Sequence, residues 1–246
     1  MNAKDRLIVA LDVPRLDEAR ALVDRLAGAV GMFKVGSQLF TEAGPAFVHE
    51  LRARGEKVFL DLKYHDIPNT VGNAVSRASD LGVSLLTVHA LGGRPMLEAA
   101  RAGASGSLTR ILAITVLTSH AEDSLGELGI SGSLPESVER LARLAKTAGV
   151  DGVVASPREV AVVRAACGPG FLVVTPGIRP AGAPRGDQAR AATPEEAVAQ
   201  GADYIVVGRP ILAAPDPRAA AVAIVASLPQ EGSSSGGSST PGASAA

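Results

Sequence analysis

The sequence is poor in residues and runs that several classes of protein require. It has one cysteine, no tryptophan and only 3% aromatic residues in a chain of 246. The single cysteine, Cys167, excludes an intrachain disulfide and fits a reducing compartment, so we interpret it as a packing residue. Scarce aromatics argue against a stacking platform for single-stranded nucleic acid. Because no run of about 18 apolar residues occurs, no membrane span is predicted.

Positively and negatively charged residues are nearly equal in number. The formal net charge is −1, so no overall field would attract nucleic acid or an anionic membrane. Lys4, Asp5 and Arg6 place charges where an export signal would need apolar residues, and we therefore expect a cytoplasmic protein. With 46% hydrophobic and 20% charged residues, the composition is that of a globular protein whose core needs no disulfide or metal.

The end of the chain differs in composition from the rest. Residues 232–246 are only Gly, Ser, Thr, Pro and Ala, and they have no apolar pattern to bury. We predict a single catalytic domain over residues 1–230 and a disordered Gly/Ser-rich tail over residues 231–246.

Eight short apolar runs alternate with amphipathic helical stretches. The runs are continuous in apolar character, which indicates strands buried on both faces. Alternating strands and helices predict a parallel sheet, and eight units in this length predict a closed (β/α)8 barrel of the TIM type, with an open doubly wound sheet as the main alternative. The runs are residues 7–11, 32–35, 58–62, 85–88, 111–117, 152–155, 171–174 and 204–207, and the helical stretches include 16–26, 38–53, 71–81, 95–104, 137–148 and 157–166.

Polar and ionisable residues follow directly after these apolar runs. In a barrel the carboxyl ends of the strands converge on one mouth, whereas in an open sheet they are spread along a line. The large share of ionisable side chains favours a barrel mouth that carries chemistry. The residues are Asp12, Lys34, Asp61, Lys63, His89, Thr118, Ser119, Ser156, Arg179 and Arg209.

The third run leads into an acid–lysine–acid cluster. Asp61 and Lys63 are two positions apart at a strand end, which places both side chains on one side, and Asp66 follows on the loop. Pro68 suits the first turn of the next helix, which Asp66 or Asn69 could cap. A lysine between two carboxylates stays protonated, so it is a poor Schiff-base nucleophile and a good proton donor to a carbanion. A surface salt-bridge cluster is the alternative that spacing alone leaves open.

The run DLKYHDIPNT at residues 61–70 resembles the signature of orotidine 5'-phosphate decarboxylases. The resemblance extends over nearly the whole predicted domain, and its occurrence in this order disfavours the salt-bridge interpretation. The tail is not part of it. The further matching pieces are ALD at 10–12, FKVG at 33–36, TVHA at 87–90, VLTS at 116–119, TPGIRP at 175–180, DQ at 187–188 and VGRPI at 207–211.

The resemblance implies a cofactor-free lyase of pyrimidine biosynthesis that removes CO2 from C6 of orotidine 5'-monophosphate to give UMP. Lys63 would protonate the carbanion left at C6, and Asp61 would lie beside the departing carboxylate. Asp66, as a third catalytic residue, and Thr70 would reach into the site of a neighbouring subunit. The resemblance therefore implies a homodimer with shared active sites.

The phosphate end of the substrate can also be argued from the residues. Arg179 follows run seven and the pair Gly208 and Arg209 follows run eight, where barrels of this type often bind phosphate. Residues 176–190 have little helical pattern and are interpreted as a lid over the phosphate. The resemblance also assigns Gln188 to phosphate or base contacts. It places Asp12 and Lys34 at the ribose hydroxyls and Thr118 near the pyrimidine ring.

Two other functions remain open at this point. A phosphosugar aldolase or synthase on a related barrel shares an Asp-x-Lys-x-x-Asp arrangement but uses Mg²⁺. A non-catalytic phosphometabolite-binding protein would need the arginines but not the acid–lysine–acid cluster. The four histidines form no metal-spaced pair, so no metal or cofactor is predicted. His89 is expected at the mouth without a catalytic role.

Overall fold

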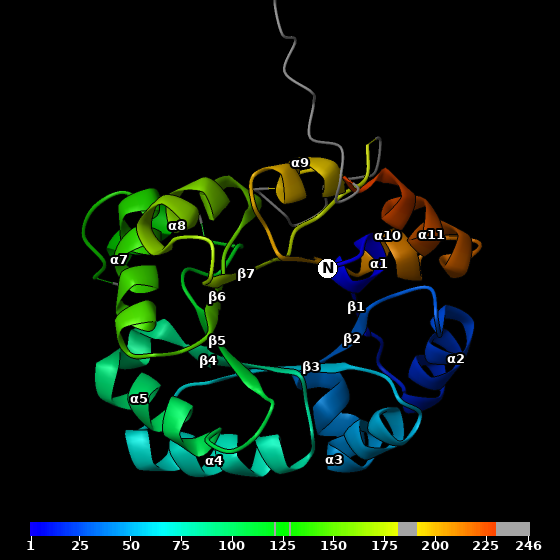
Figure 1. The fold of residues 1–246 in the computed structure, drawn as a ribbon, viewed down its shortest axis with the longest axis horizontal. Helices are drawn as coiled ribbons and strands as arrows, with labels where there is room; N and C mark the ends of the chain where they lie inside the picture. Colours follow the sequence, from blue (N-terminus) through cyan, green and yellow to red (C-terminus); the bar gives the residue numbers. More distant parts are fainter. Residues whose placement is uncertain (121, 128, 182–190, 230–246) are drawn as a thin grey trace, which may run out of the picture.

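The structure, a computed structural model, describes residues 1–120, 122–127, 129–181 and 191–229. Eight parallel strands close into a barrel in chain order, with β8 paired to β1 (Figure 1). The predicted (β/α)8 barrel is confirmed, and the open sheet was the wrong alternative. The strands are β1 (Leu7–Ala10), β2 (Met32–Gly36), β3 (Val58–Tyr64), β4 (Leu85–His89), β5 (Arg110–Ile114), β6 (Gly152–Val154), β7 (Leu172–Thr175) and β8 (Tyr204–Val207).

Helices lie around the outside of the barrel and at its two ends (Figure 1). They are α1 (Ala3–Arg6), α2 (Leu16–Leu26), α3 (Ser37–Ala53), α4 (Pro68–Asp80), α5 (Gly93–Gly103), α6 (Glu122–Glu127), α7 (Leu134–Thr147), α8 (Val160–Cys167), α9 (Pro194–Ala199), α10 (Arg209–Leu212) and α11 (Pro217–Ser227), with short 3-10 turns η1 (Ala90–Gly92) and η2 (Pro157–Glu159).

The strands bury both faces, as their continuous apolar character predicts. Outward-facing side chains such as Leu7, Val9 and Phe33 pack with the helices in the main core. Inward-facing side chains fill the barrel in a second cluster. That cluster consists of Ile8, Ala10, Met32, Phe59, Leu85, Leu112, Val174 and Val206.

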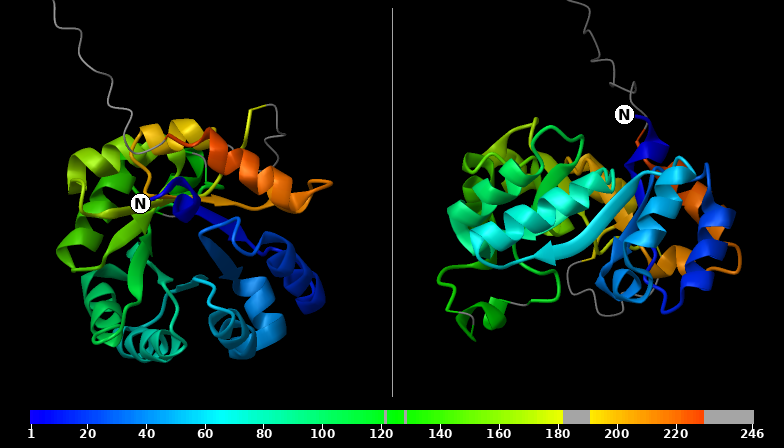
Figure 2. Two further views of the ribbon diagram at one scale, coloured as in Figure 1. Left: turned by 45° about the vertical axis from the view of Figure 1, so that its right-hand side comes forward. Right: turned by 90° about the horizontal axis from the view of Figure 1, so that it is seen from below.

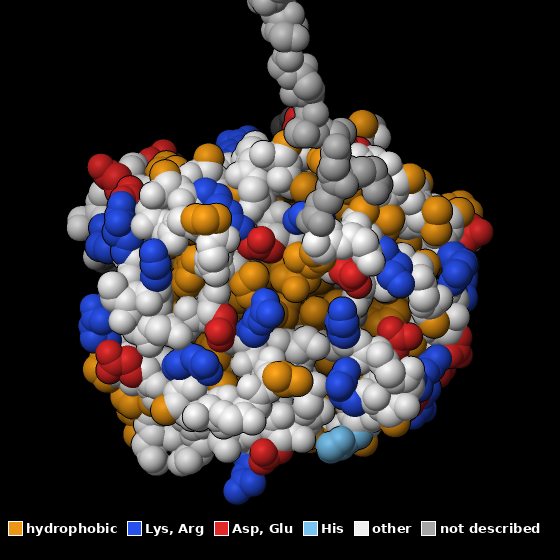
Figure 3. All heavy atoms as spheres, in the orientation of Figure 1, with side chains coloured by type: hydrophobic (Ala, Val, Ile, Leu, Met, Phe, Trp, Pro, Cys, Tyr) orange, Lys and Arg blue, Asp and Glu red, His pale blue; other side chains and the backbone are white. Residues whose placement is uncertain are grey.

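The two ends of the barrel are different. α1 precedes β1 and lies at the end where the strands begin, while the short green α6 lies at the opposite end (Figure 2, right). Figure 3 shows the face that carries α1, where side chains of both charges are interspersed around a hollow floored by hydrophobic groups. The described ranges contain no helix long and apolar enough to cross a membrane.

Most strands and helices differ from the sequence prediction by one to three residues at an end, and three differences concern the cavity or the shape of a helix. The fifth strand was predicted over residues 111–117 but ends at Ile114, because Val116 and Leu117 are apolar as lining of a cavity and not as strand. The third strand continues two residues further, to Tyr64. α3 is interrupted at Gly44 (φ 63°), directly before Pro45, whose ring and missing N–H do not fit a helix interior.

The last described helix, α11, ends at Ser227, and Leu228 is buried against the core. The tail predicted over residues 231–246 lies outside the described residues.

Candidate active site

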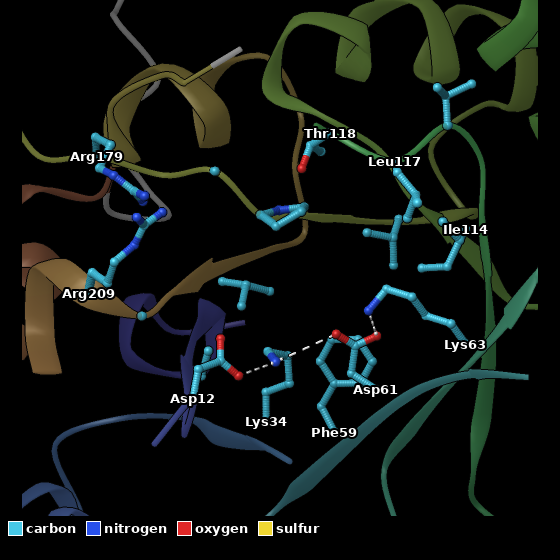
Figure 4. A pocket seen from close by; sticks show the side chains of 17 residues that line it. Asp12, Lys34, Phe59, Asp61, Lys63, Ile114, Leu117, Thr118, Arg179 and Arg209 are labelled. Atoms are coloured by element: carbon cyan, nitrogen blue, oxygen red, sulfur yellow. Dashed lines mark hydrogen bonds and ion pairs between the residues drawn. The ribbon is translucent and has the colours of Figure 1, made fainter. Parts of the chain in front are cut away.

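A cavity of about 410 Å³ opens where the strands end (Figure 4). This volume lies within the range of small-molecule sites. Its lining comes from seven of the eight strands or the loops that follow them. The residues are Ala10, Asp12, Lys34, Phe59, Asp61, Lys63, Ile114, Val116, Leu117, Thr118, Val154, Pro176, Gly177, Arg179, Val206, Gly208 and Arg209.

Strand alternation explains how charged side chains come to face this cavity. Successive residues of a strand point to opposite faces, so every second residue points into the barrel. Ala10 is followed two positions later by Asp12, and Phe59 is followed two positions later by Asp61. Inward apolar residues thus form the floor, and on β1, β2 and β3 the next inward position carries a charge.

Four of these side chains form a chain of alternating charge across one side of the cavity. Lys34 Nζ lies 2.9 Å from Asp12 Oδ1 and 3.6 Å from Asp61 Oδ2. Lys63 Nζ donates to Asp61 Oδ1 at 2.9 Å. The prediction that Asp61 and Lys63 share one side is therefore confirmed, and Asp61 lies between two ammonium groups.

The electrostatics of this chain favour a charged Asp61. Burial alone would raise the pKa of Asp61, but the Lys34 and Lys63 ammonium groups hold it below its ordinary value. Hydrogen bonds from Lys63 and Thr87 act in the same direction. The carboxylate is thus ionised at neutral pH although its side chain is only 13% exposed.

Gly36 makes room for the pair formed by Lys34 and Asp12. A Cβ atom at this position would lie 3.0 Å from Lys34 Nζ and 3.4 Å from Asp12 Oδ1. Sequence reasoning quoted Gly36 within a matching piece but gave it no role. The only sequence feature that could have identified Gly36 is its position two residues after Lys34, on the inward side of β2.

Two arginines occupy the other side of the cavity. Arg179 and Arg209 direct their guanidinium groups toward one another, across the cavity from Lys63 (Figure 4). Gly208, at the start of α10, lines the wall beside them, and Thr118 lines the cavity from the loop after β5. A ligand with an anionic group at the arginine side and a polar or charged group near Lys63 would find a charged side chain at each end.

Some predicted site residues are not brought into the cavity. Asp66 and Thr70 are exposed and do not line it, and Gln188 lies outside the described residues. The start of α4 has Pro68 in its first turn as predicted, but neither predicted cap is present, since Ile67 is the N-cap residue. Asp66 instead accepts a hydrogen bond from the Ile67 backbone N–H at 2.6 Å.

The histidine at the end of β4 lies beside the cavity and not in its lining. His89 stacks on His65 with ring centroids 5.2 Å apart. Burial, with smaller contributions from the charges of His65, Lys63 and His120, lowers the pKa of His89 to about 4. The ring is therefore neutral at pH 7. Within the described part of the chain, no group of three or more His, Cys, Asp and Glu is placed to hold a metal ion.

Comparison with known families gives the cavity its context. The model of the orotidine 5'-phosphate decarboxylase / HUMPS family matches residues 5–224. The chain belongs to this family. The match spans all eight strands, so every cavity-lining residue lies within it.

Individual family members are similar over nearly their full length. Orotidine 5'-phosphate decarboxylase from Moorella thermoacetica is 56% identical over 236 residues, covering 93% of this chain and 94% of the relative. The enzyme of the same name from Halorhodospira halophila is 56% identical over 229 residues, covering 92% of this chain and 97% of the relative. A crystal structure of orotidine 5'-phosphate decarboxylase from Lactobacillus acidophilus is 41% identical, with a TM-score of 0.81 over 90% of this chain and 98% of that one.

Proposed function

We propose that this chain decarboxylates orotidine 5'-monophosphate to UMP and CO2 without a metal or cofactor. The observation that carries the proposal is the chain of alternating charge that ends in Lys63, facing two arginines across one cavity. A substrate with a carboxylate on its base and a phosphate at its other end matches this distribution. The names of the similar proteins from Moorella thermoacetica and Halorhodospira halophila support the same substrate.

Lys63 is the proton donor in this proposal. The bond between C6 and the carboxylate carbon breaks, CO2 leaves, and the electron pair remains at C6. An N–H bond of the Lys63 ammonium then breaks as its proton passes to C6, and solvent later reprotonates the amine. Asp61 favours this chemistry because a carboxylate that accepts a hydrogen bond from Nζ at 2.9 Å fixes the position of the ammonium group at the cavity.

Asp61 would also lie beside the carboxylate that leaves. Two carboxylates in one low-dielectric cavity repel, which would raise the energy of bound substrate relative to the transition state. Asp61 could equally act only by preorganising Lys63. These two roles differ in the expected effect on substrate binding.

The remaining lining residues are assigned to the rest of the substrate. Asp12 and Lys34 would bind the ribose hydroxyls, and Thr118 would lie near the pyrimidine ring. Arg179, Arg209 and the backbone at Gly208 would hold the phosphate, since guanidinium groups bind phosphate oxygens in pairs. Gln188 is assigned to the phosphate or base by resemblance alone.

Removal of the Arg209 side chain is expected to weaken the binding of UMP much more than the binding of uridine. A charge-assisted hydrogen bond contributes about 1.5–3 kcal/mol, so Arg209→Ala should raise the Kd of UMP by roughly 10–150-fold. The Kd of uridine, which has no phosphate, should change by less than about threefold on the same reasoning. Calorimetric titration of both ligands measures this, with Arg179→Ala as a second variant.

Arg110→Ala serves as the control for these arginine variants. Arg110 is exposed at the beginning of β5, the end of the barrel away from the cavity. Its removal should leave both affinities unchanged. Equal losses for UMP and uridine in Arg209→Ala would refute the phosphate assignment.

We also propose a homodimer with shared active sites. Residues 65–70, which contain Asp66 and Thr70, are all exposed in the single chain. The segment includes Ile67, which is 65% exposed. An exposed isoleucine between residues that the resemblance assigns to a neighbouring site supports contact with a second copy in this segment.

Mixing two inactive variants tests the shared sites. Lys63→Ala and Asp66→Ala homodimers should each be nearly inactive, whereas a mixed dimer has one site with both native residues. Random re-association of equal amounts gives about half mixed dimers, so about a quarter of wild-type activity should return. Unchanged activity after verified subunit exchange would show that Asp66 serves its own chain.

We place the enzyme in the cytoplasm. Cys167 is a free cysteine buried at the end of α8, and burial raises the pKa of its thiol, against the smaller effects of Lys146, Arg143 and Arg164. A buried, protonated thiol packs as an apolar group and suits a reducing compartment.

The substrate assignment is tested by product analysis. Purified protein incubated with orotidine 5'-monophosphate should release CO2 and UMP in equal amounts. The phosphosugar aldolase alternative would instead turn over a sugar phosphate with added Mg²⁺. A phosphometabolite-binding protein would bind UMP without consuming either substrate.

A further inference from the structure

The backbone that carries Lys63 departs from regular strand geometry. β3 is in register with β4 at Leu60 and Leu86, and again at Tyr64 and Val88. Four steps along β3 therefore match two steps along β4, so two extra residues of β3 bulge between them. Among the described residues, Lys63 is the only non-glycine with a positive φ, at 53°. A side chain in this left-handed region is unfavourable unless neighbouring groups hold it.

The hydroxyl of Thr87 is the group opposite this bulge. Thr87 lies on β4 two residues after the inward-facing Leu85, and its side chain is fully buried. The Lys63 backbone N–H donates to Thr87 Oγ1 at 2.9 Å, and Thr87 Oγ1 donates to Asp61 Oδ1 at 3.0 Å. The same Asp61 oxygen accepts the hydrogen bond from Lys63 Nζ.

These contacts form a closed loop through one hydroxyl. A hydroxyl can accept a hydrogen bond and donate one at the same time, which no apolar side chain of the same shape can do. The loop joins the backbone of Lys63, the carboxylate of Asp61 and the ammonium group of Lys63. Thr87 does not line the cavity, so it acts through its neighbours and not on substrate.

We propose that Thr87 is a positioning residue, whose hydroxyl sets the geometry between Asp61 and the proton donor Lys63. The chemical consequence rests on the proposed function, whereas the geometry does not. Without the hydroxyl, the Lys63 N–H loses its partner in the bulge and Asp61 loses a donor. A displacement of about 1 Å in a reacting group can cost roughly 100-fold in rate.

Two pairs of variants isolate the hydroxyl. Thr87→Val keeps the shape and removes the hydroxyl, and Thr87→Ser keeps the hydroxyl. Thr87→Ala compared with Thr87→Ser repeats the contrast at smaller volume, in case the valine variant does not fold. Thr109→Val is the matched control, because Thr109 is buried at the other end of β5 and its hydroxyl donates only to the Val83 carbonyl, at 2.8 Å.

We expect Thr87→Val to lower kcat for orotidine 5'-monophosphate by about 10–100-fold. The Kd of UMP should stay within about threefold, since the phosphate and ribose contacts are untouched. A donor to a carboxylate favours its ionised form, so loss of the donor raises the pKa of Asp61. The acid limb of the kcat profile should therefore move to higher pH. Thr87→Ser should retain most of kcat, and Thr109→Val should match wild type.

A second readout does not depend on turnover. The carboxyl carbon signal of Asp61, assigned with Asp61→Asn, should titrate at higher pH in Thr87→Val than in wild type. A kcat of Thr87→Val within threefold of wild type, or a serine variant no better than the alanine variant, would overturn the positioning role. If the wild type does not decarboxylate orotidine 5'-monophosphate, the proposed function fails, and an unchanged Asp61 titration in Thr87→Val would then overturn this inference separately.

Discussion

Replacing Lys63 with alanine is expected to lower kcat for orotidine 5'-monophosphate by about 10⁴-fold or more. General acid catalysis contributes about 10²–10⁴, and a charge directed at a developing anion contributes a further 10²–10³. In the proposed mechanism the Lys63 side chain supplies both. The rate is measured by the loss of substrate absorbance at saturating concentration.

The fold should survive this substitution. The Lys63 side chain is 38% exposed, so its removal creates little buried void. Asp61 keeps the Lys34 ammonium group at 3.6 Å and the Thr87 hydroxyl at 3.0 Å, so it is not left as an unpaired buried charge. Thermal unfolding followed by circular dichroism should therefore resemble that of wild type.

Lys57→Ala is the matched control. Lys57 directly precedes β3, at the opposite end of the strand from Lys63, and its Nζ lies 3.6 Å from Asp5. The same chemical change is thus made in another lysine–aspartate pair, between the residue before β3 and α1. Unaltered kcat in Lys57→Ala is expected. A kcat for Lys63→Ala within tenfold of wild type would contradict the assignment of Lys63 as proton donor.

The second large effect is expected for Asp61→Asn. Asparagine has nearly the same shape but no charge, so Lys34 and Lys63 would face one another without the anion between them. Loss of one preorganised electrostatic group costs about 10²–10³ in kcat. The Kd of UMP, which has no carboxylate on its base, should change by only about threefold or less.

The binding of substrate in this variant separates the two roles of Asp61. If Asp61 repels the substrate carboxylate, Asp61→Asn lowers KM together with kcat, whereas a purely preorganising Asp61 leaves KM unchanged. Asp5→Asn, which alters the partner of Lys57 at the other end of the barrel, is the control. A loss of less than tenfold in kcat would show that the charge on Asp61 is not needed.

The sequence was sufficient for the parts of the site that follow from strand periodicity. Asp12, Lys34 and Asp61 each lie at or near the end of an apolar run on the inward side, and the structure brings all three to one cavity. Apolar content alone could not predict where a strand ends. Val116 and Leu117 are apolar because they line the cavity, and they lie beyond the end of β5.

The bulge at Lys63 could not be predicted, since a register shift depends on the neighbouring strand and not on local sequence. Thr87 was quoted within a predicted strand and a matching piece but was given no role, for the same reason. A polar residue at an inward position of an apolar run, one layer above Leu85, is the signal that could have identified it. The roles proposed for Asp66 and Thr70 are not visible in a single chain, where both residues are exposed.

Decarboxylation by metal-free protein tests the central claim most directly. The protein is chelated exhaustively, and kcat/KM for orotidine 5'-monophosphate is measured before chelation, after it, and after Mg²⁺ is restored. We expect the three values to agree, because Lys63 and Asp61 supply the charges that a metal would otherwise provide. Activity that disappears on chelation and returns with Mg²⁺ would contradict the account and favour the aldolase-type alternative.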